Sequence, residues 1–247
     1  MISENKKIYF ASDFHLGNSS VKENLKREKK IVSWLNEIKK DAKSIYLIGD
    51  IFDFWFEYKQ VVPKGFVRLL GSLAELSDRG IKIHFVVGNH DLWMKDYFSE
   101  QIDATIHYNN LILEESDKKI FIGHGDGLGD GDYLYKLLKK VFTSKICQWL
   151  FQRLHPDFSV SLAKYWSEKN ASRKKNPEFK SEQEELLVGY CKKQQQKERV
   201  DYYIFGHRHL PLKIPIDQDS YYINTGDWIN HFSYAVFDGK KLNLEKF

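Results

Sequence analysis

The chain of 247 residues contains only two cysteines, Cys147 and Cys191, which lie far apart in the sequence. Two distant cysteines do not make a disulfide framework, so we predict ordinary thiols in a reducing compartment. No run of about 18 apolar residues occurs, which excludes a membrane-spanning helix. Residues 1–7 are mostly polar and lead directly into an apolar strand pattern, which argues against a signal peptide. These absences favour a cytoplasmic protein.

Several signatures of nucleotide and nucleophilic chemistry are also missing. The sequence has no G-x-x-x-x-G-K-[ST] phosphate loop, no G-x-G-x-x-G dinucleotide fingerprint and no evident nucleophilic Ser or Cys motif. It has no internal repeat and no low-complexity tract. The net charge is only +4, but residues 128–198 hold 12 Lys and 2 Arg against 9 Asp and Glu, which leaves the rest of the chain near −1. The basic excess is therefore confined to one region.

Short apolar runs alternate with amphipathic patterns in the first half of the chain. Residues 8–11, 45–48 and 81–87 are predicted strands, and residues 23–40 and 63–80 have the apolar spacing of helices. This order predicts a largely parallel sheet with helices on its faces. Further short strands are predicted at residues 111–113, 119–122, 202–205, 212–216, 221–224, 234–237 and 242–245. We therefore predict an α/β fold: a four-layer α/β/β/α sandwich of two mixed sheets.

Residues 128–198 interrupt this pattern of strands. Their apolar spacing predicts one helix over residues 134–154 and further helices near 158–174 and 181–198. We predict a core formed by residues 1–127 and 199–247, and a helical insertion over residues 128–198 that projects from the core as a cap. The simpler interpretation is that the apolar side of this insertion only packs on the core.

Five short polar motifs follow predicted strands, and they contain five of the nine histidines. The motifs are Asp13-Phe14-His15, Gly49-Asp50-Ile51-Phe52-Asp53, Gly88-Asn89-His90-Asp91, Gly123-His124-Gly125-Asp126 and Gly206-His207-Arg208-His209. In α/β folds, ligands bind beyond the carboxyl ends of the strands. Carboxylates, an amide oxygen and imidazoles at such ends suit two divalent ions that lie side by side. Donors of this kind without cysteine favour Mn²⁺, Fe²⁺ or Zn²⁺ over Ca²⁺, and the donor types alone do not choose among these three metals. We predict two divalent ions, with Mn²⁺ as the first candidate.

The types of the side chains predict different roles at this site. Asp50 is the natural bridge, because a carboxylate has two oxygens and two adjacent dications need shared negative charge. His90 follows Asn89 directly and is a candidate to protonate the leaving group or to stabilise the transition state. Asp53 is expected to brace its loop, and Asp91 to orient His90 or a backbone amide.

The five motifs in this order resemble the calcineurin-like metallophosphoesterase superfamily, whose pattern D-x-H, G-D-x-x-D, G-N-H-D, G-H and G-H-x-H is present in full. The resemblance implies one ion held by Asp13, His15, Asp50 and His209. It implies a second ion held by Asp50, Asn89, His124 and His207. It also implies hydrolysis of a phosphoester by water activated between the ions, with His90, Asp50 and Asn89 as catalytic residues.

The wider context is similar to the UDP-2,3-diacylglucosamine hydrolases of lipid A biosynthesis. The similarity rests on the aromatic residues 49–55, the long fourth motif over 124–133, Gly226-Asp227-Trp228 and the helical insertion. It implies cleavage of the pyrophosphate bond of UDP-2,3-diacylglucosamine to UMP and 2,3-diacylglucosamine 1-phosphate. The implied substrate contacts are Asn89, Asp132, Ser167, Asn170, Lys174 and His207. Many members of this family carry Arg at the position of His90.

A basic, amphipathic cap suits such a substrate, because two acyl chains need an apolar slot and the diphosphate needs cations. The cap would also allow peripheral contact with the anionic inner face of a membrane. Two alternatives remain open: a metallophosphoesterase that acts on a nucleotide, another phosphodiester or nucleic acid, and a non-catalytic scaffold that binds a protein. We expect neither nucleic acid nor an obligate protein partner, because a nuclease needs a broad basic path with stacking aromatics and such scaffolds usually lose ligands.

Overall fold

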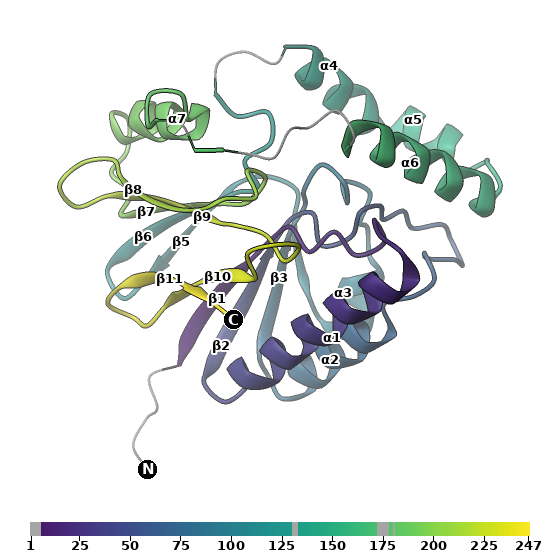
Figure 1. Ribbon diagram of the computed structural model, residues 1–247, viewed down its shortest axis with the longest axis horizontal. Coiled ribbons are helices and arrows are strands. Elements are labelled where there is room, and N and C mark those ends of the chain that lie inside the picture. The colour runs from purple at the N-terminus through teal and green to yellow at the C-terminus, as the bar shows by residue number, and fades with distance from the viewer. Residues whose placement is uncertain (1–5, 130–132, 172–177, 180) are drawn as a thin grey trace.

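The apolar runs of the sequence form the strands of two β-sheets in the computed structural model, which describes residues 6–129, 133–171, 178–179 and 181–247 (Figure 1). The first sheet has the order β11-β10-β1-β2-β3-β4. Its strands are β1 (Lys7–Ala11), β2 (Ala42–Ile48), β3 (Lys82–Val86), β4 (Thr105–His107), β10 (Ser233–Phe237) and β11 (Leu242–Lys246). Strands β1 to β4 are parallel, and β10 and β11 add an antiparallel edge. The short β4 was not predicted from the sequence.

The second sheet has the order β5-β6-β7-β9-β8. Its strands are β5 (Leu111–Glu115), β6 (Lys118–Ile122), β7 (Tyr202–Phe205), β8 (Pro211–Pro215) and β9 (Tyr221–Thr225). The inner strands β6, β7 and β9 are parallel, whereas β5 and β8 pair antiparallel at the edges. Both sheets are therefore mixed, as predicted.

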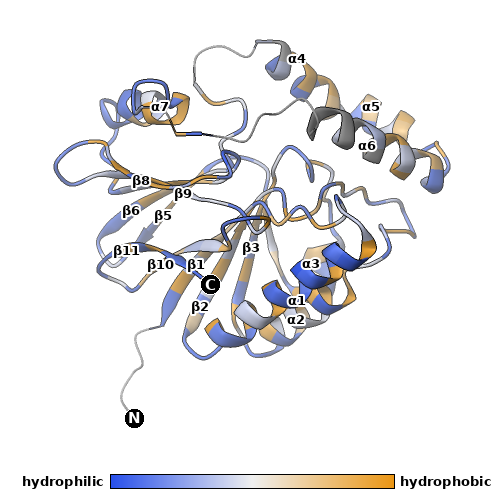
Figure 2. Ribbon diagram, in the orientation of Figure 1, coloured by the Kyte–Doolittle hydropathy of each residue, from blue (hydrophilic) through white to orange (hydrophobic). Residues whose placement is uncertain are grey.

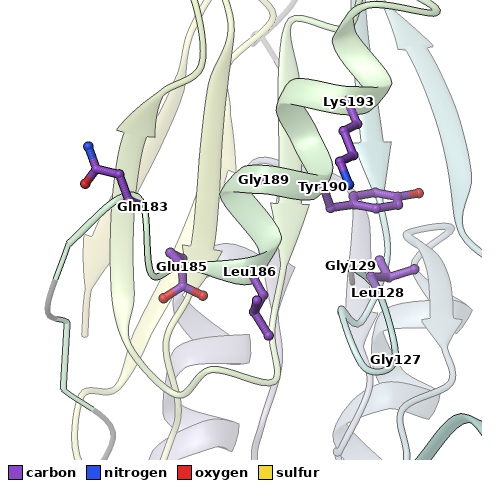
Figure 3. A pocket seen from close by; sticks show the side chains of 9 residues that line it. All are labelled: Gly127, Leu128, Gly129, Gln183, Glu185, Leu186, Gly189, Tyr190 and Lys193. Carbon is purple, nitrogen blue, oxygen red and sulfur yellow. The ribbon is translucent and has the colours of Figure 1, made fainter. Parts of the chain in front are cut away.

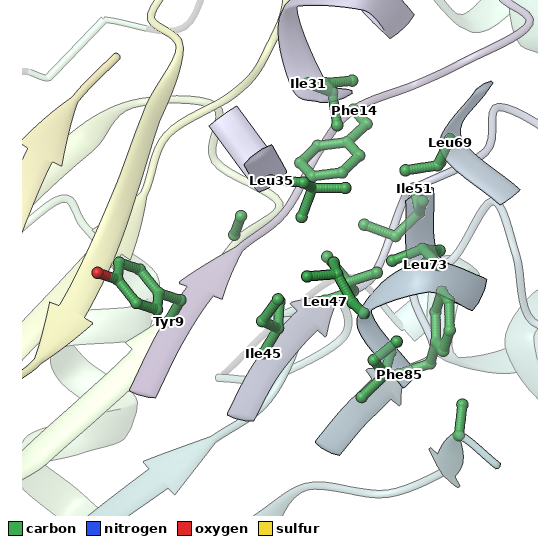
Figure 4. Close-up of a cluster of buried hydrophobic side chains, with 14 of the residues drawn as sticks. Tyr9, Phe14, Ile31, Leu35, Ile45, Leu47, Ile51, Leu69, Leu73 and Phe85 are labelled. Carbon is green, nitrogen blue, oxygen red and sulfur yellow. The ribbon is translucent and has the colours of Figure 1, made fainter. Parts of the chain in front are cut away.

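The two sheets pack face to face through Phe10 and Ile48 of the first sheet and Ile122 and Ile204 of the second. The outer face of the first sheet is covered by α1 (Val21–Ile38), α2 (Val67–Asp78) and the short α3 (Tyr97–Ile102), which the sequence did not reveal. Figure 4 shows Leu35 of α1 and Leu73 of α2 directed toward the side chains of this sheet. A capping box between Ser20 and Glu23 begins α1.

The fourth layer is α7 (Leu186–Gln195), which lies on the outer face of the second sheet. Its buried Leu187, Val188 and Cys191 pack with Tyr203 and Tyr222 of the sheet. This helix falls inside the predicted insertion over residues 128–198, yet it packs as a layer of the core. The predicted four-layer α/β/β/α sandwich is therefore present, with α7 as its outermost helix.

The part of the insertion that stands apart from the sheets consists of α4 (Tyr133–Phe142), α5 (Lys145–Phe151) and α6 (Pro156–Ala171), which we call the cap helices (Figure 1). The prediction of a single helix over residues 134–154 is wrong, because the chain breaks between α4 and α5. The Thr143 hydroxyl donates to the Lys139 carbonyl, and Ser144 adopts an extended conformation. Thr and Ser near a helix end offer the backbone such alternative hydrogen bonds.

Candidate metal centre

The five polar motifs meet where the parallel strands of both sheets end. Three groups of side chains result, and within each group one nitrogen or oxygen atom per residue lies within 4.8 Å of the others. One group, His15, Asp53 and His90, shares His15 with the first of the two clusters that contain only predicted ligands. The first cluster is Asp13, His15 and His209, and the second is Asp50, His124 and His207. The carboxyl ends of β1 and β2 in one sheet and of β6 and β7 in the other supply these residues, so the fold brings together positions almost 200 residues apart.

The backbone of the motifs is strained where the side chains turn inward. Asp13, His15, Asp50, His207 and His209 all have positive φ angles, between 44° and 65°. They are five of the ten non-glycine residues with positive φ in the described part of the chain. Such conformations cost roughly 1–3 kcal/mol each and concentrate at functional sites. Asp13 and His15 both direct their side chains toward one cluster, as residues two positions apart do along an extended chain.

The first cluster joins two imidazoles and one fully buried carboxylate. The Nε2 atom of His209 lies 3.1 Å from Asp13 Oδ1 and 3.1 Å from the Nε2 atom of His15. Asp13 Oδ1 lies 3.7 Å from His15 Nε2 and has no hydrogen-bond partner. Three donor atoms that face one another in this way are arranged as ligands of a shared cation.

The second cluster is linked to the first by the carboxylate of Asp50. Its Oδ2 atom lies 3.2 Å from Nε2 of His124 and 3.7 Å from Nε2 of His15. One carboxylate oxygen thus faces a histidine from each cluster. Burial and the nearby His124 lower the pKa of His207 to about 4, so its imidazole is neutral at neutral pH. The neutral imidazole is the form that binds metal.

Partnerless buried atoms provide a test of whether these residues fit metal ions. Five buried side-chain atoms in the described residues have no hydrogen-bond partner, and three of them are Asp13 Oδ1, Asn89 Oδ1 and His124 Nε2. A buried polar atom without a partner costs about 1–3 kcal/mol. All three atoms belong to predicted ligands, and two divalent cations would satisfy them, one at Asp13 and the other at Asn89 and His124. The donor set therefore fits a metal centre.

The pKa shifts of the buried carboxylates and imidazoles also favour a metal centre. Burial favours neutral side chains, yet the pKa of Asp13 is held well below its usual range by His209 and His15. Burial also opposes protonation of His15 and His124, but the nearby carboxylates raise the pKa of each to about 10. Carboxylates that attract protons so strongly also attract divalent cations, which bind in exchange for those protons.

Hydrogen bonds behind the two clusters orient the imidazoles. Nδ1 of His124 donates to the Ile48 carbonyl at 2.9 Å, which leaves Nε2 free to accept. Nδ1 of His15 lies 3.3 Å from Asp53 Oδ1, and Nδ1 of His209 lies 3.5 Å from Asp227 Oδ2. Such partners hold a metal-binding histidine in one tautomer and one orientation. Asp227 belongs to the Gly226-Asp227-Trp228 element, whose role could not be read from the sequence.

His90 lies beside the first cluster and is partly exposed. Its backbone N–H donates to Asp50 Oδ1 at 2.9 Å, and its ring centre lies 4.8 Å from that of His15. Nδ1 of His90 is 2.9 Å from the Asp53 carbonyl oxygen, so an N–H there leaves Nε2 for proton exchange. Asp91 accepts hydrogen bonds from the backbone N–H groups of Gly88, Asp50 and Ile51, and so it orients backbone amides.

Two residues that hold the motifs from behind were missed in the sequence. Arg27 on α1 donates through Nη1 to the carbonyls of His15 at 2.8 Å and Phe14 at 3.2 Å. Asp126 accepts hydrogen bonds from the Tyr135 hydroxyl and, at 2.6 Å, from Lys139 Nζ. Arg27 could not be recognised as a supporting residue from the sequence, because it is one of many charged residues in an amphipathic helix pattern. Asp126 belongs to the fourth motif, but its partners on α4 depend on the tertiary structure.

The predicted substrate contacts are only partly within the described residues. His207 lies in the second cluster, and Asn89 directly precedes His90, whose backbone N–H donates to Asp50 Oδ1. Ser167 is half-buried on α6, and it is one of the groups that lower the pKa of the Asp53 carboxyl against the effect of burial. Asp132, Lys174 and the side chain of Asn170 lie outside the described residues. The assignment of these four polar side chains from the insertion to the substrate stays a prediction.

Comparison with known proteins agrees with this geometry. The family described as calcineurin-like phosphoesterase matches residues 6–211. The UDP-2,3-diacylglucosamine hydrolase of Porphyromonas gingivalis is 37% identical over 253 residues, which cover 97% of this chain and 97% of that protein. A Haemophilus influenzae protein of the same name is 25% identical and covers 92% of this chain and 93% of its own. Among solved structures, the E. coli phosphoesterase Yfce aligns with a TM-score of 0.48 and 15% identity, covering 97% of this chain and 92% of its own.

Proposed function

The chain belongs to the calcineurin-like phosphoesterase family, and we propose that it hydrolyses the pyrophosphate bond of UDP-2,3-diacylglucosamine to UMP and 2,3-diacylglucosamine 1-phosphate. The observation that carries the proposal is the convergence of six donor residues in two clusters; two of them, Asp13 and His124, and the predicted ligand Asn89 each present a buried atom without a partner. Similarity over almost the whole length to a hydrolase of that name supports the substrate.

We propose that Asp13, His15, Asp50 and His209 hold one divalent ion and that Asp50, Asn89, His124 and His207 hold the other, with Mn²⁺ as the native metal. Two such ions supply positive charge to the phosphate oxygens and lower the pKa of an attacking water. Asp50 is the shared ligand in this assignment, because its Oδ2 atom faces both clusters.

His90 is the proposed proton donor to the leaving phosphate oxygen. Its Nδ1 is held by the Asp53 carbonyl, which directs the other ring nitrogen away from the loop. An imidazole beside the reacting phosphate can serve as a general acid for the leaving oxygen. The same ring, when protonated, stabilises negative charge that develops on the leaving group.

The cap helices suit the acylated half of the substrate. Large apolar side chains remain exposed on them: Ile146 is 71% exposed, Trp149 53% and Phe158 59%. Figure 2 shows hydrophobic residues along α4 and α5 among hydrophilic ones, and the exposed Lys140 and Lys145 flank them. We propose that residues 128–198 serve as the cap through α4 to α6, which receive the acyl chains.

The same surface supports peripheral contact with the anionic, cytoplasmic face of the inner membrane. Across the described residues, no helix combines the length and apolar character needed to cross a bilayer. A surface that exposes apolar side chains among lysines suits binding at the headgroup level instead.

The cap is anchored to the loops that carry the metal-centre motifs. The Trp93 indole N–H donates to the Phe142 carbonyl at 2.6 Å, and the Phe151 ring packs against Phe56 at 4.9 Å between ring centres. The Tyr58 hydroxyl hydrogen-bonds Ser159 on α6. Phe56 and Trp93 follow Asp50 and Asn89 in the sequence, so the cap is attached beside the proposed site of cleavage.

Turnover of three substrates in the presence of Mn²⁺ tests the proposal. We expect cleavage of UDP-2,3-diacylglucosamine to UMP, weak cleavage of bis-p-nitrophenyl phosphate and none of single-stranded DNA. The double variant Ile146→Gln with Trp149→Gln should reduce cleavage of the lipid far more than that of the small diester. Val67→Gln is the control, because Val67 is also exposed but lies on α2.

Cleavage of the small diester or of DNA without any cleavage of the lipid would refute the substrate and favour a phosphoesterase of other specificity. Equal loss of both activities in the cap variant would show that the cap does not bind the acyl chains. Absence of bound metal after reconstitution would favour a non-catalytic scaffold.

A further inference from the structure

A cavity of about 470 Å³ lies between α7 and the loop that follows the His124 motif (Figure 3). Gly127, Leu128 and Gly129 form one wall, and residues of α7 form the other. In Figure 1, α7 lies on the side of the molecule away from α5 and α6. The cavity is thus separate from the surface that we assign to the acyl chains.

The cavity is connected to two of the metal-centre motifs, through the chain on one side and through an ion pair on the other. Gly127 follows His124 by three residues, a length of chain that spans at most about 11 Å. On the other side, Glu185 lines the cavity and accepts hydrogen bonds from Arg208 Nε at 2.9 and 3.1 Å. Arg208 lies between His207 and His209 in the sequence. A ligand with a phosphate at the metal centre therefore has its next group within reach of this cavity.

The walls combine a flat ring, apolar side chains and a cation. The Tyr190 ring is held from behind by Phe121 and Phe205, with ring centres 6.1 and 6.4 Å away. Leu128 and Leu186 add apolar surface, and Lys193 lies beside the Tyr190 ring (Figure 3). The Glu185 carboxylate is paired with Arg208, which compensates its negative charge. The carboxylate therefore does not exclude an anionic ligand from the cavity. A flat heteroaromatic ring with an attached anionic group suits such walls.

Gly189 lines this cavity and leaves room for a ligand on the side of α7. It lies inside α7, where glycine costs about 1 kcal/mol relative to alanine. A Cβ atom at this position would meet nothing within 4 Å, and the backbone has no positive φ that would require glycine. Neither packing nor conformation explains the residue. The missing side chain keeps this wall of the cavity open, so that a large side chain at this position would fill it.

We propose that this cavity binds the uridine half of the substrate and retains the UMP product, an inference that rests on the proposed function. The diphosphate then crosses the metal centre, with the nucleoside beside α7 and the acylated sugar under the cap helices. The walls select a pyrimidine nucleotide through the Tyr190 ring and the space above Gly189.

The variant Gly189→Phe tests the proposal by filling the cavity. Binding of UMP to the Mn²⁺-loaded protein is measured by calorimetry, and turnover is measured on UDP-2,3-diacylglucosamine and on bis-p-nitrophenyl phosphate. We expect UMP binding to weaken about tenfold or more. The loss in kcat/KM on the lipid should exceed the loss on the small diester by a similar factor, since the diester has no uridine.

Gly71→Phe is the matched control, because Gly71 also lies inside a helix, on α2, with nothing within 4 Å of its Cβ position. Lys193→Met is a second variant that does not depend on how the helix tolerates phenylalanine, and it should also weaken UMP binding. If both Gly189→Phe and Lys193→Met bind UMP as Gly71→Phe does, the assignment of the cavity is wrong. AMP that binds the unmodified protein as tightly as UMP would overturn the assignment to a pyrimidine.

Failure of the proposed function has a different outcome. A protein that binds UMP but does not cleave the UDP-linked lipid would refute the substrate. The cavity would still be assigned if Gly189→Phe abolished that binding.

Discussion

Replacing Arg27 by methionine tests how the loop that carries Asp13 and His15 is held. Both of these residues have positive φ, so the loop is strained. The Arg27 guanidinium donates to the carbonyls of Phe14 and His15 through Nη1 and to the Ser19 hydroxyl through Nη2. We infer that these hydrogen bonds keep the first cluster in its inward conformation.

The size of the effect follows from these contacts. A hydrogen bond from a charged group contributes about 1.5–3 kcal/mol, and water replaces part of what is lost at a half-buried site. We expect Arg27→Met to lower the free energy of unfolding by about 2–4 kcal/mol, which corresponds to a Tm lower by about 5–12 °C in a chain of this size. Removing the support of metal ligands commonly weakens metal binding about 10–100-fold, and we expect the same here for Mn²⁺.

Calorimetric titration with Mn²⁺ and thermal unfolding measure both effects. Lys26→Met is the control, since Lys26 is an exposed residue of the same helix. Arg27→Lys should restore part of the affinity, because one ammonium group replaces only some of the three contacts. If Arg27→Met lost stability but bound Mn²⁺ with the stoichiometry and affinity of Lys26→Met, the residue would support the fold without positioning the ligands.

Three further predictions concern the cap, the metal and pH. Asp126→Asn should raise KM for the lipid more than it changes turnover of bis-p-nitrophenyl phosphate, because its contacts with Tyr135 and Lys139 hold α4; equal effects on both substrates would contradict this role. EDTA should lower the Tm and abolish turnover, and added Mn²⁺ should restore both, because a ligand that binds only the folded state stabilises it; an unchanged Tm would argue against a metal centre. Burial opposes ionisation of Asp201, but Lys119 N–H and Lys118 lower its pKa, so the stability difference between wild type and Asp201→Asn should be present above pH about 4 and vanish as pH falls through the lowered pKa. Urea unfolding at pH 7 and pH 3 measures it, and a difference that grows at pH 3 would show the wrong sign.

The positions of the candidate ligands followed from the sequence for a simple reason. Buried parallel strands are near-continuous apolar runs, and the carboxyl ends of neighbouring strands reach the same edge of a sheet. A polar motif directly after each run, as at Asp13 and Asp50, must therefore lie at that edge. Because the two sheets pack face to face, His124 and His207, which follow strands of the second sheet, face the same centre as Asp50.

The cap was harder to predict, because apolar spacing does not show what an apolar residue packs against. Leu187 and Cys191 of α7 have the same pattern as the residues of α4, yet they are buried on the second sheet, whereas Leu137 of α4 is 59% exposed. The break at Ser144 was equally hidden, since Thr and Ser are tolerated in helices. Local hydrogen bonds and the packing of Phe151 on Phe56 decide that the chain turns there.

By itself, the amino-acid sequence indicated the donor types of the candidate centre and the positions of most strands along the chain, because donor types and apolar runs are local properties of the chain. Only the tertiary structure decided which groups stand behind the ligands, since Arg27, Asp126 and Asp227 act through partners that are distant in sequence or hidden in ordinary patterns. It also decided which apolar faces are covered and where an open cavity remains beside α7. Whether a side chain is buried depends on which other parts of the chain pack against it. The local sequence pattern does not contain that information.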